Sequence, residues 1–337
     1  MIGILIVNLG TPDAPTAPAV RRYLRAFLSD TRVVELPRIL WWPILNGPVL
    51  LTRPTRSARN YASIWLPEGS PLLVYSQRQC NALQARWARR FPDEVRVELA
   101  MRYGNPSVAR GMAALRDAGC HKILVVPLYA QYAAATTASI FDAVAHTLRG
   151  WREIPEIRMI RDWHAHPAYI RALAENIRAW WQEHGPAERL LISFHGLPQA
   201  CITRGDPYRA QCEKTTALLV QALGLSDDQW TQSFQSRFGA AQWLKPYTDK
   251  MLMELGRSGV RRVDVVCPGF TADCVETLQE IAMEGKETFL QAGGKVLRYI
   301  PALNDHPRWI DAFSEILEPH WRYWEDPEHF AVSAQPG

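Results

Sequence analysis

Short apolar runs recur along the whole chain, and stretches with a helical spacing of apolar residues separate them. The runs lie at 3–8, 95–100, 122–128, 156–160, 189–194, 231–235, 262–267 and 295–300. Helical spacing is found over 71–90, 106–117, 208–223 and 273–290. Strands that alternate with helices are typical of βαβ units. The pattern therefore predicts an α/β protein built of parallel sheets flanked by helices.

The chain also resembles itself, because segments of its first part return later. The matching pairs are "GILIVNLGTP" (3–12) with "RLLISFHGLP" (189–198), "DAGCHKILVVP" (117–127) with "RSGVRRVDVVCP" (257–268), and "HPAYIRAL" (166–173) with "HPRWIDAF" (306–313). The first pair is offset by 186 residues and the other two by 140, so the first half holds an insertion of 46 residues between Pro12 and Gly119. We expect two similar domains, 1–160 and 161–320, with a substrate cleft between them and a tail at 321–337.

The apolar segment "LPRILWWPILNGPVLLTRP" (36–54) fits as that insertion. Four prolines break it and Arg38 and Arg53 interrupt it, so it cannot span a bilayer as one helix. Two interpretations stay open for this segment. It is either a buried hairpin of helices or an exposed apolar lip that touches a ligand or a membrane surface.

Composition narrows the class of protein. With 47% hydrophobic and 21% charged residues, the chain is an ordinary globular protein rather than a disordered one. The net charge of +4 comes without a dense run of Lys and Arg, so we expect no nucleic-acid partner. The six Cys lack zinc-finger spacing, and the amino terminus has neither a basic region nor a cleavage site. These features indicate a cytoplasmic protein with reduced thiols.

One histidine stands at the end of a buried strand. His195 follows the apolar run at 189–194 and precedes Gly196 and Pro198. Ligands of parallel sheets bind beyond the carboxyl ends of the strands. In the repeat, Leu9 occupies the position of His195, so the turn itself does not require an imidazole. This favours a functional role for His195 over a structural one.

Three carboxylates recur on the helix predicted at 273–290. Glu276, Glu280 and Glu284 follow one another every four residues and share one helix face. The row is either a solvated acidic face or a path for a cation or for protons. Glu276 comes in the first turns after a strand end, in the same crevice as His195. A His and a carboxylate suit a divalent first-row metal, and as two ligands they hold it only weakly.

Motifs of other chemistries are missing from the sequence. It contains no GxGxxG after the first strand, no GxxxxGK[ST], no HExxH and no GxSxG. Dinucleotide-binding, P-loop, zincin and hydrolase-elbow interpretations therefore have no motif to support them.

Several sequence blocks, in one order, resemble the ferrochelatases, the enzymes that insert ferrous iron into a porphyrin. The blocks are "NLGTP" (8–12), "GSPL" (69–72), "MRYGNP" (101–106), "SFHGLP" (193–198), "RGDPY" (204–208), "FQSRFGAAQWLKP" (234–246) and "PGFTADCVETL" (268–278). The resemblance runs from Gly3 to about Trp321. It implies two similar Rossmann-like domains of the chelatase type, each a parallel sheet flanked by helices, with a porphyrin cleft between them.

The resemblance also assigns roles to individual residues. It implies that His195 takes pyrrole protons or meets the metal, and that Glu276 is its carboxylate partner across the cleft. Glu280 and Glu284 then form a path for protons or iron. Substrate-binding roles fall on Leu9, Arg53, Ser70, Arg102, Tyr103 and Trp243. Among these, Arg53 and Ser70 match groups that hold propionates, and the apolar Leu9 favours protoporphyrin IX.

The implied activity is that of a lyase. It inserts ferrous iron into protoporphyrin IX to form protohaem, releases two protons and is the terminal step of haem biosynthesis. Animal members carry a carboxyl-terminal cysteine cluster for an iron–sulfur centre, whereas no Cys follows Cys274 here. We therefore expect Fe²⁺ as a substrate, no permanently bound cofactor and no iron–sulfur cluster. Two alternatives stay open: a cobalt or other tetrapyrrole chelatase of the same fold, and a haem- or porphyrin-binding protein without catalysis.

Overall fold

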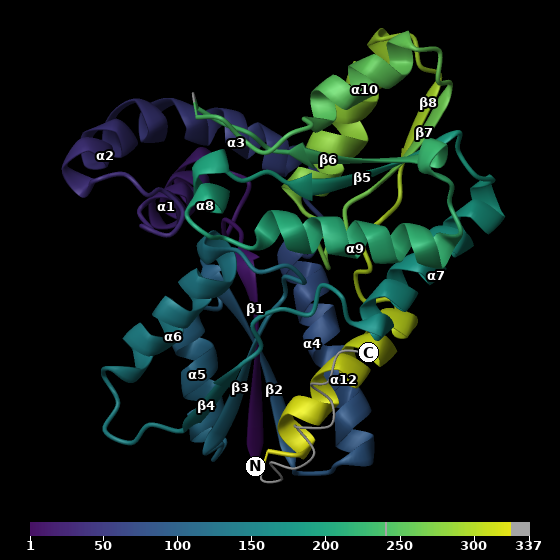
Figure 1. Ribbon diagram of the computed structural model, residues 1–337. Helices are drawn as coiled ribbons and strands as arrows, with labels where there is room; N and C mark the ends of the chain where they lie inside the picture. The colour runs from purple at the N-terminus through teal and green to yellow at the C-terminus, as the bar shows by residue number, and fades with distance from the viewer. Residues whose placement is uncertain (240, 325–337) are drawn as a thin grey trace.

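Two four-stranded parallel sheets form the centre of the molecule in the computed structural model, which describes residues 1–239 and 241–324 (Figure 1). The first sheet has the order β2–β1–β3–β4 and the second the order β6–β5–β7–β8. The bounds are β1 Ile2–Gly10, β2 Val95–Tyr103, β3 Lys122–Pro127, β4 Glu156–Met159, β5 Arg189–His195, β6 Trp230–Gln235, β7 Arg262–Val266 and β8 Val296–Tyr299. The predicted α/β class with parallel sheets is confirmed, and each sheet lies within one of the predicted segments 1–160 and 161–320.

Helices flank both sheets. They are α1 Ala17–Leu28, α2 Arg38–Ile44, α3 Leu50–Ile64, α4 Pro71–Arg90, α5 Val108–Asp117, α6 Ser139–Leu148, α7 Pro167–His184, α8 Gln199–Thr203, α9 Tyr208–Leu223, α10 Thr248–Arg257, α11 Lys286–Gln291 and α12 Pro307–Arg322. Three short π-helices, η1 Leu45–Val49, η2 Ala134–Ala138 and η4 Val275–Gly285, and the 3₁₀-helix η3 Asp227–Gln229 complete the elements.

Two predicted helices have the predicted bounds, and a third differs in type. Pro71 starts α4 because its fixed φ suits a first helical position. Gly224 ends α9 because it adopts a left-handed conformation with φ 72°. The segment expected as one helix over 273–290 is π-helical over Val275–Gly285 before α11 continues it. Hydrogen bonds from i to i+5 widen that helix, so residues four apart remain close to one face.

The helix that follows the last strand of each sheet packs against elements that flank the other sheet. Helix α7 follows β4 of the first sheet, but it packs on α9, and Trp181 donates a hydrogen bond to Asp264 of β7. Helix α12 follows β8 of the second sheet, yet it lies against α4, next to the first sheet (Figure 1). There the Trp87 indole donates to Ser314 at 2.8 Å and its ring meets that of Trp321 at 5.4 Å. One continuous apolar core therefore joins the two sheets.

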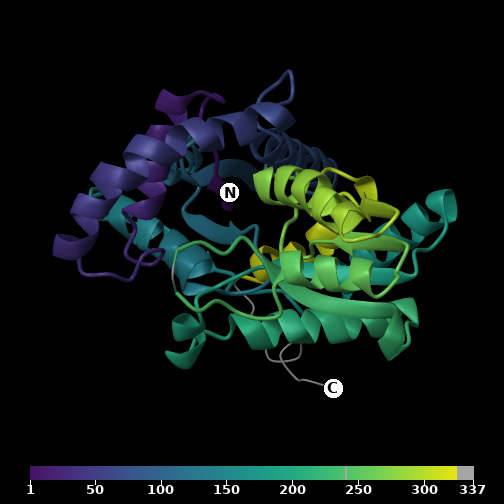
Figure 2. The ribbon, with the colours of Figure 1, turned by 90° about the horizontal axis from the view of Figure 1, so that it is seen from above.

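The predicted insertion falls in the segment between β1 and α4, which forms the helices α1 to α3 on one side of the molecule (Figure 2). Its most apolar segment, 36–54, is an exposed lip rather than a buried hairpin. The exposed side chains are Leu36, Ile39, Leu40, Trp42, Ile44 and Leu51, with Ile39 at 87%. Leu45 and Leu50 are buried beneath them, and the Trp41 indole donates to the carbonyl of Leu28 at 2.6 Å.

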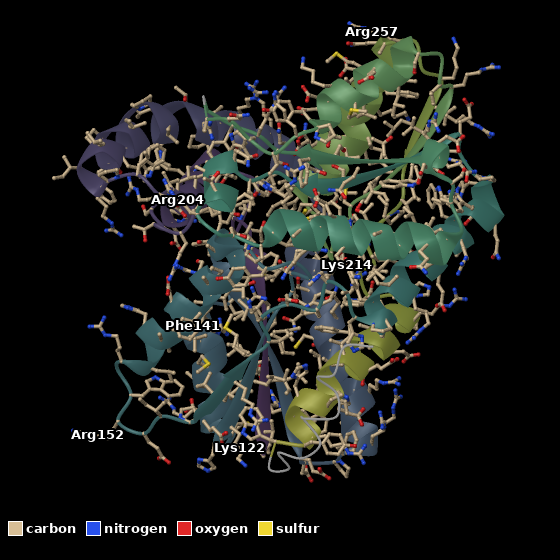
Figure 3. The ribbon with its side chains drawn as sticks, viewed as in Figure 1. Lys122, Phe141, Arg152, Arg204, Lys214 and Arg257 are labelled. Atoms are coloured by element: carbon tan, nitrogen blue, oxygen red, sulfur yellow. The ribbon has the colours of Figure 1, made fainter. Side chains whose placement is uncertain are left out.

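The lip is attached to the second half near its root. Arg204, which follows α8 and is labelled in Figure 3, forms an ion pair with Glu35. Across the described residues, no helix combines the length and apolar character that a membrane span needs. Of the predicted tail 321–337, Trp321 is buried in the core, and residues 325–337 lie outside the described residues.

Candidate active site

A cavity opens where the end of β1 faces η4, and it takes its walls from both halves of the chain. Its lining residues are Asn8, Leu9, Gly10, Thr11, Tyr23, Tyr61, Ser70, Leu72, Tyr129, Phe270, Cys274, Val275 and Glu276. The wall is mostly apolar and aromatic. Among its polar groups, the buried hydroxyl of Tyr129 has no hydrogen-bond partner among the described residues. A flat apolar ligand with a few polar groups suits such a site.

Two glycines explain why the chain can turn so tightly beside this cavity. Gly10 ends β1 with φ 115°, and a Cβ there would lie 1.7 Å from the carbonyl oxygen of Tyr103. Gly196 follows β5, where a Cβ would lie 2.8 Å from the carbonyl oxygen of Gln235. Only glycine fits either position, because any side chain would collide with the neighbouring strand. The same close turn thus ends the central strand of both sheets.

His195 is half-buried at the carboxyl end of β5. Its Nδ1 lies 2.7 Å from the carbonyl oxygen of Gly196. A carbonyl can only accept, so Nδ1 carries the proton, and Nε2 holds the lone pair of the neutral imidazole. The Tyr208 hydroxyl donates to the backbone carbonyl of His195 at 2.9 Å and fixes the strand end. The imidazole is therefore held in the tautomer that presents Nε2 as a base.

Glu280 is the carboxylate that interacts with His195. The backbone N–H of Ser236 donates to one of its oxygens at 2.7 Å, and the Ser236 hydroxyl donates to the other. Ser236 adopts φ 65°, a left-handed conformation that points both donors at the carboxylate. Burial raises the pKa of Glu280, although Ser236 and His195 both favour its charged form. Burial and the two Ser236 donors thus act on Glu280 in opposite directions.

Glu276 lies one π-turn before Glu280 and lines the cavity. Gln235, which pairs with His195 in the strand register, donates its side-chain N–H to the Glu276 carbonyl at 2.7 Å. The π-helix is thereby tied to the end of β6, the strand that pairs with β5 beside His195. Burial, and next the Glu276 carboxylate, raise the pKa of the Tyr23 phenol on the facing wall. The structure therefore brings Glu276 to the cavity and joins its helix to His195 through Gln235.

Glu284 ends the row of carboxylates at the surface. Glu276 and Glu280 are half-buried, whereas Glu284 is exposed. The Gln279 side chain donates to Glu284 at 2.8 Å and accepts a hydrogen bond of 3.0 Å from Asn60 of α3. The three carboxylates thus run from the cavity to solvent along one π-helix.

Two of the predicted substrate-binding residues line the cavity, and two others, Trp243 and Arg53, meet at Phe238 outside its lining. Leu9 and Ser70 line it, and Ser70 accepts a hydrogen bond of 2.8 Å from Thr11. Trp243 is buried under the turn after β5 and donates to the carbonyl of Phe238 at 2.9 Å. Arg53 places its guanidinium over the Phe238 ring, 5.4 Å from the centroid. Arg53 therefore reaches from the insertion to the loop that carries Trp243.

Arg102 and Tyr103 are joined to a residue that sequence reasoning missed. Arg102 Nη2 and the Tyr103 hydroxyl both donate to Asp30, at 2.6 and 2.7 Å. Arg102 Nε also donates to the carbonyl of Ser139 at 2.8 Å. The polar groups of both residues are thus used within the protein. No local pattern in the sequence marks Asp30, because its partners come from 72 to 109 residues further along the chain.

The geometry shows no resident metal centre in the part of the chain that the structure describes. No three His, Cys, Asp or Glu side chains converge there on one point. The imidazole of His195 and one neighbouring carboxylate would supply only two ligands. Two ligands hold a metal weakly, so they suit a metal that passes through the site better than one that stays.

Comparison with known proteins gives a consistent family. The family model described as Ferrochelatase matches residues 1–321. A ferrochelatase of Azoarcus sp. is 56% identical over 322 residues, which cover 96% of this chain and 88% of that protein. A ferrochelatase of Methylococcus capsulatus is 55% identical over 320 residues, with 94% and 96% covered.

Solved structures share the fold at low sequence identity. SirB from Bacillus subtilis with Fe³⁺ has a TM-score of 0.56 at 15% identity and covers 97% of this chain and 98% of its own. The sirohydrochlorin chelatase SirB from Bacillus subtilis subspecies spizizenii, in complex with cobalt, has a TM-score of 0.55 at 14% identity, with 97% of both chains covered. At such identity, these likenesses show a common chelatase fold and nothing about the ligand.

Proposed function

The chain belongs to the ferrochelatase family, the lyases of haem biosynthesis that insert ferrous iron into a porphyrin, and we propose how its cavity carries out this reaction. The substrates are protoporphyrin IX and Fe²⁺, and the ring exchanges two pyrrole N–H protons for the metal. The site must therefore hold the ring, accept two protons and admit iron. We assign each task to a different group of residues in the cavity wall or on β5 and η4 beside it.

His195 is the proton acceptor in this proposal. The hydrogen bond from Nδ1 to the Gly196 carbonyl supports it, because it leaves the lone pair on Nε2. An imidazole accepts protons efficiently near neutral pH. Glu280 stabilises the imidazolium that forms, and its position beside Ser236 allows it to take the proton onward. The tautomer of His195 is the observation that carries the proposal.

The row of carboxylates connects this site with solvent. Glu276 faces the cavity, Glu280 lies behind it and Glu284 is exposed. A graded row of oxygen ligands can pass a cation inward or protons outward without retaining either. We assign this double use to Glu276, Glu280 and Glu284.

The aromatic and apolar wall holds the ring. Leu9, Tyr23 and Tyr61 supply flat or apolar surface from the insertion side. Binding energy from the ring edge can support a bent ring, which exposes the pyrrole nitrogens and approaches the transition state. We assign the propionates to Ser70, which lines the cavity, and to Arg53, whose guanidinium lies over the Phe238 ring.

Anaerobic mixing of the protein with protoporphyrin IX and Fe²⁺, followed by absorption spectroscopy, tests the activity. We expect the spectrum of the metal-free porphyrin to give way to that of protohaem. Glu276→Gln keeps the shape of the side chain and removes its charge. We expect it to lower the insertion rate about 10²-fold or more while the porphyrin dissociation constant stays within about twofold.

Glu287→Gln is the matched control, because Glu287 is an exposed glutamate on the following helix, α11. Its insertion rate should equal that of the unchanged protein. If porphyrin affinity falls in step with turnover in Glu276→Gln, Glu276 holds the ring and the assignment is wrong. Insertion of cobalt into another tetrapyrrole without activity toward iron, or tight porphyrin binding without insertion, would instead support one of the two alternative functions.

We also propose that the protein resides in the cytoplasm and contacts a membrane surface through the lip. The exposed apolar side chains of 36–54 support this, and Arg38 and Arg53 are exposed in the same segment. Apolar side chains that enter the headgroup region, flanked by cations, give reversible binding to anionic lipid. Flotation with anionic vesicles tests it: Ile39→Ser with Leu40→Ser should abolish flotation, and flotation that persists would disprove the contact.

The protein works without an iron–sulfur cluster in this proposal. The sequence supports this, because no Cys follows Cys274. Cys274 itself is buried next to Glu276, and burial raises the pKa of its thiol well above its ordinary value. A buried neutral thiol is a poor cluster ligand. Absorption and iron analysis of the purified protein should show no cluster, and a stoichiometric iron and sulfide content would contradict this.

A further inference from the structure

Asp30 lies directly after α1, at the root of the lip, and is saturated with hydrogen bonds. One oxygen, Oδ2, accepts from Arg102 Nη2 at 2.6 Å, from the Tyr103 hydroxyl at 2.7 Å and from the Ser139 hydroxyl at 2.6 Å. The other, Oδ1, accepts from the backbone N–H of Arg32 at 2.7 Å. Its side chain is only 8% exposed. A carboxylate with this many donors is stable only in its charged form.

The donors come from separate elements of the first half. Arg102 and Tyr103 end β2, and Ser139 begins α6. Asp30 therefore joins the insertion to the edge of the first sheet. This is the edge at which parallel sheets bind ligands, so the insertion occupies the ligand crevice of its own half.

A chain of aromatic rings leads from Asp30 to the cavity. The ring of Tyr103 meets Phe27 edge-on at 5.2 Å, and Phe27 stacks on Tyr23 at 6.1 Å. Tyr23 then meets Tyr61 edge-on at 6.4 Å. Both Tyr23 and Tyr61 line the cavity. A shift of Tyr103 is transmitted to the cavity wall because these rings are packed against each other.

We propose that Asp30 is a positioning residue for the porphyrin-binding wall. It holds Tyr103 and Arg102, and through the rings of Phe27 and Tyr23 it sets the wall against which the porphyrin lies. This inference rests on the proposed function for the identity of the ligand. Asp30 takes no part in the removal of protons. Its replacement therefore weakens the binding of the porphyrin and leaves the insertion of iron unchanged.

Asp30→Asn tests the inference, because asparagine keeps the size but cannot accept from three donors at once. We expect the KM for protoporphyrin IX and its dissociation constant, measured by fluorescence titration, to rise about tenfold, the worth of one hydrogen bond to a charged group. The KM for Fe²⁺ and kcat should stay within about twofold. Tyr103→Phe removes one donor and should give a smaller change in the same direction.

Asp142→Asn is the matched control. Asp142 lies on α6 and pairs with Arg32 at 2.8 Å, so it bridges the same segments, but its side chain is 44% exposed. In the Asp142→Asn variant, both KM values, kcat and the porphyrin dissociation constant should be unchanged. If Asp30→Asn lowers the melting temperature and Vmax while both KM values and the porphyrin dissociation constant stay constant, Asp30 is merely structural and the inference fails.

If Asp30→Asn does not fold, Tyr103→Phe decides, because an unchanged porphyrin dissociation constant in that variant would overturn the inference. The two proposals fail separately. An unchanged protein that binds porphyrin without inserting iron disproves the proposed function, while the dissociation constants still test Asp30.

Discussion

The first and second halves share one architecture and differ in their chemistry. Each half has its earliest strand in an inner position of the sheet, a glycine turn after that strand, and a π-helical stretch after its third strand. At the repeat offsets, the functional positions of the second half and their counterparts are His195 and Leu9, Glu276 and Thr136, Glu280 and Ile140, and Glu284 and Val144. Every ionisable group of the row has an uncharged counterpart.

The two halves therefore share one backbone arrangement, and in the proposed function four side chains of the second half distinguish it from the first. In the second half, Gln235 at the end of β6 and Ser236 just after it donate hydrogen bonds to the π-helix. In the first half, Arg102 and Tyr103 at the end of β2 engage Asp30 of the insertion instead. The second half thus holds the groups to which we assign proton transfer, and the first half forms part of the cavity wall.

The largest effect is expected when the second half receives the residue that the first half carries at the position of His195. His195→Leu places in β5 the residue that β1 already carries at the same turn. We expect kcat to fall about 10²- to 10⁴-fold through loss of the general base, with a melting temperature close to that of the unchanged protein. Initial rates and thermal unfolding measure both. A folded variant that retains most of its turnover would show that His195 is structural.

The reverse change places a carboxylate in the first half. Ile140 is fully buried, and at its position Glu lacks the donors that Ser236 gives to Glu280. Ile140→Glu should cost about 3–5 kcal/mol of unfolding free energy, because the charge is buried without a partner. Urea unfolding measures this, with Ile140→Val as control at about 0.5–1.5 kcal/mol. If Ile140→Glu loses less unfolding free energy than Ile140→Val does, the first half accepts a carboxylate at this position as well as the second half does.

A smaller effect is expected from Glu280→Gln. Burial raises the pKa of Glu280 in the folded protein, so the folded state binds this proton more tightly than the unfolded state does. The resulting stability is present below the unfolded pKa and is lost as pH rises through the folded pKa. Glutamine stays neutral and keeps both contacts to Ser236. The variant should therefore melt a few degrees higher at pH 7 and no higher at pH 4; equal shifts at both pH values would refute this.

The smallest effect is expected at the wall. Leu9→Met changes shape but neither volume nor charge, and methionine is flexible enough to fill the same space. Activity should stay within about twofold and stability within about 1.5 kcal/mol. Steady-state kinetics measure the first and urea unfolding the second. A large loss of turnover would mean that the first half takes part in the chemistry.

The strands and most helices could be predicted, because apolar periodicity reflects local burial. The runs at 189–194 and 262–267 are apolar since helices cover both faces of the sheet. The glycine turns after β1 and β5 are visible in the repeat as Gly10 and Gly196. For the same reason the repeat alone predicts that His195 stands at the end of a central strand.

Other features depend on distant contacts and could not be predicted. The π-helical form of 275–285 gives no pattern distinct from an α-helix in the sequence. Whether 36–54 is exposed depends on what packs on Leu45 and Leu50. The sequence does not show these contacts, so both interpretations stayed open. Asp30 and Ser236 act through partners far along the chain, so neither stood out. The catalytic assignments of His195 and Glu276 remain predictions until the variants are measured.

The packing of α7 and α12 across the two sheets has a consequence for biosynthesis on the ribosome. Trp87 of the first half is covered by α12, which belongs to the last residues described. The first sheet is complete once β4 at 156–159 has emerged, yet its outer helix α4 keeps an apolar face open until Ser314 and Trp321 arrive. We therefore expect the nascent amino-terminal half to keep this apolar face exposed until the chain is complete, and an exposed apolar face favours aggregation.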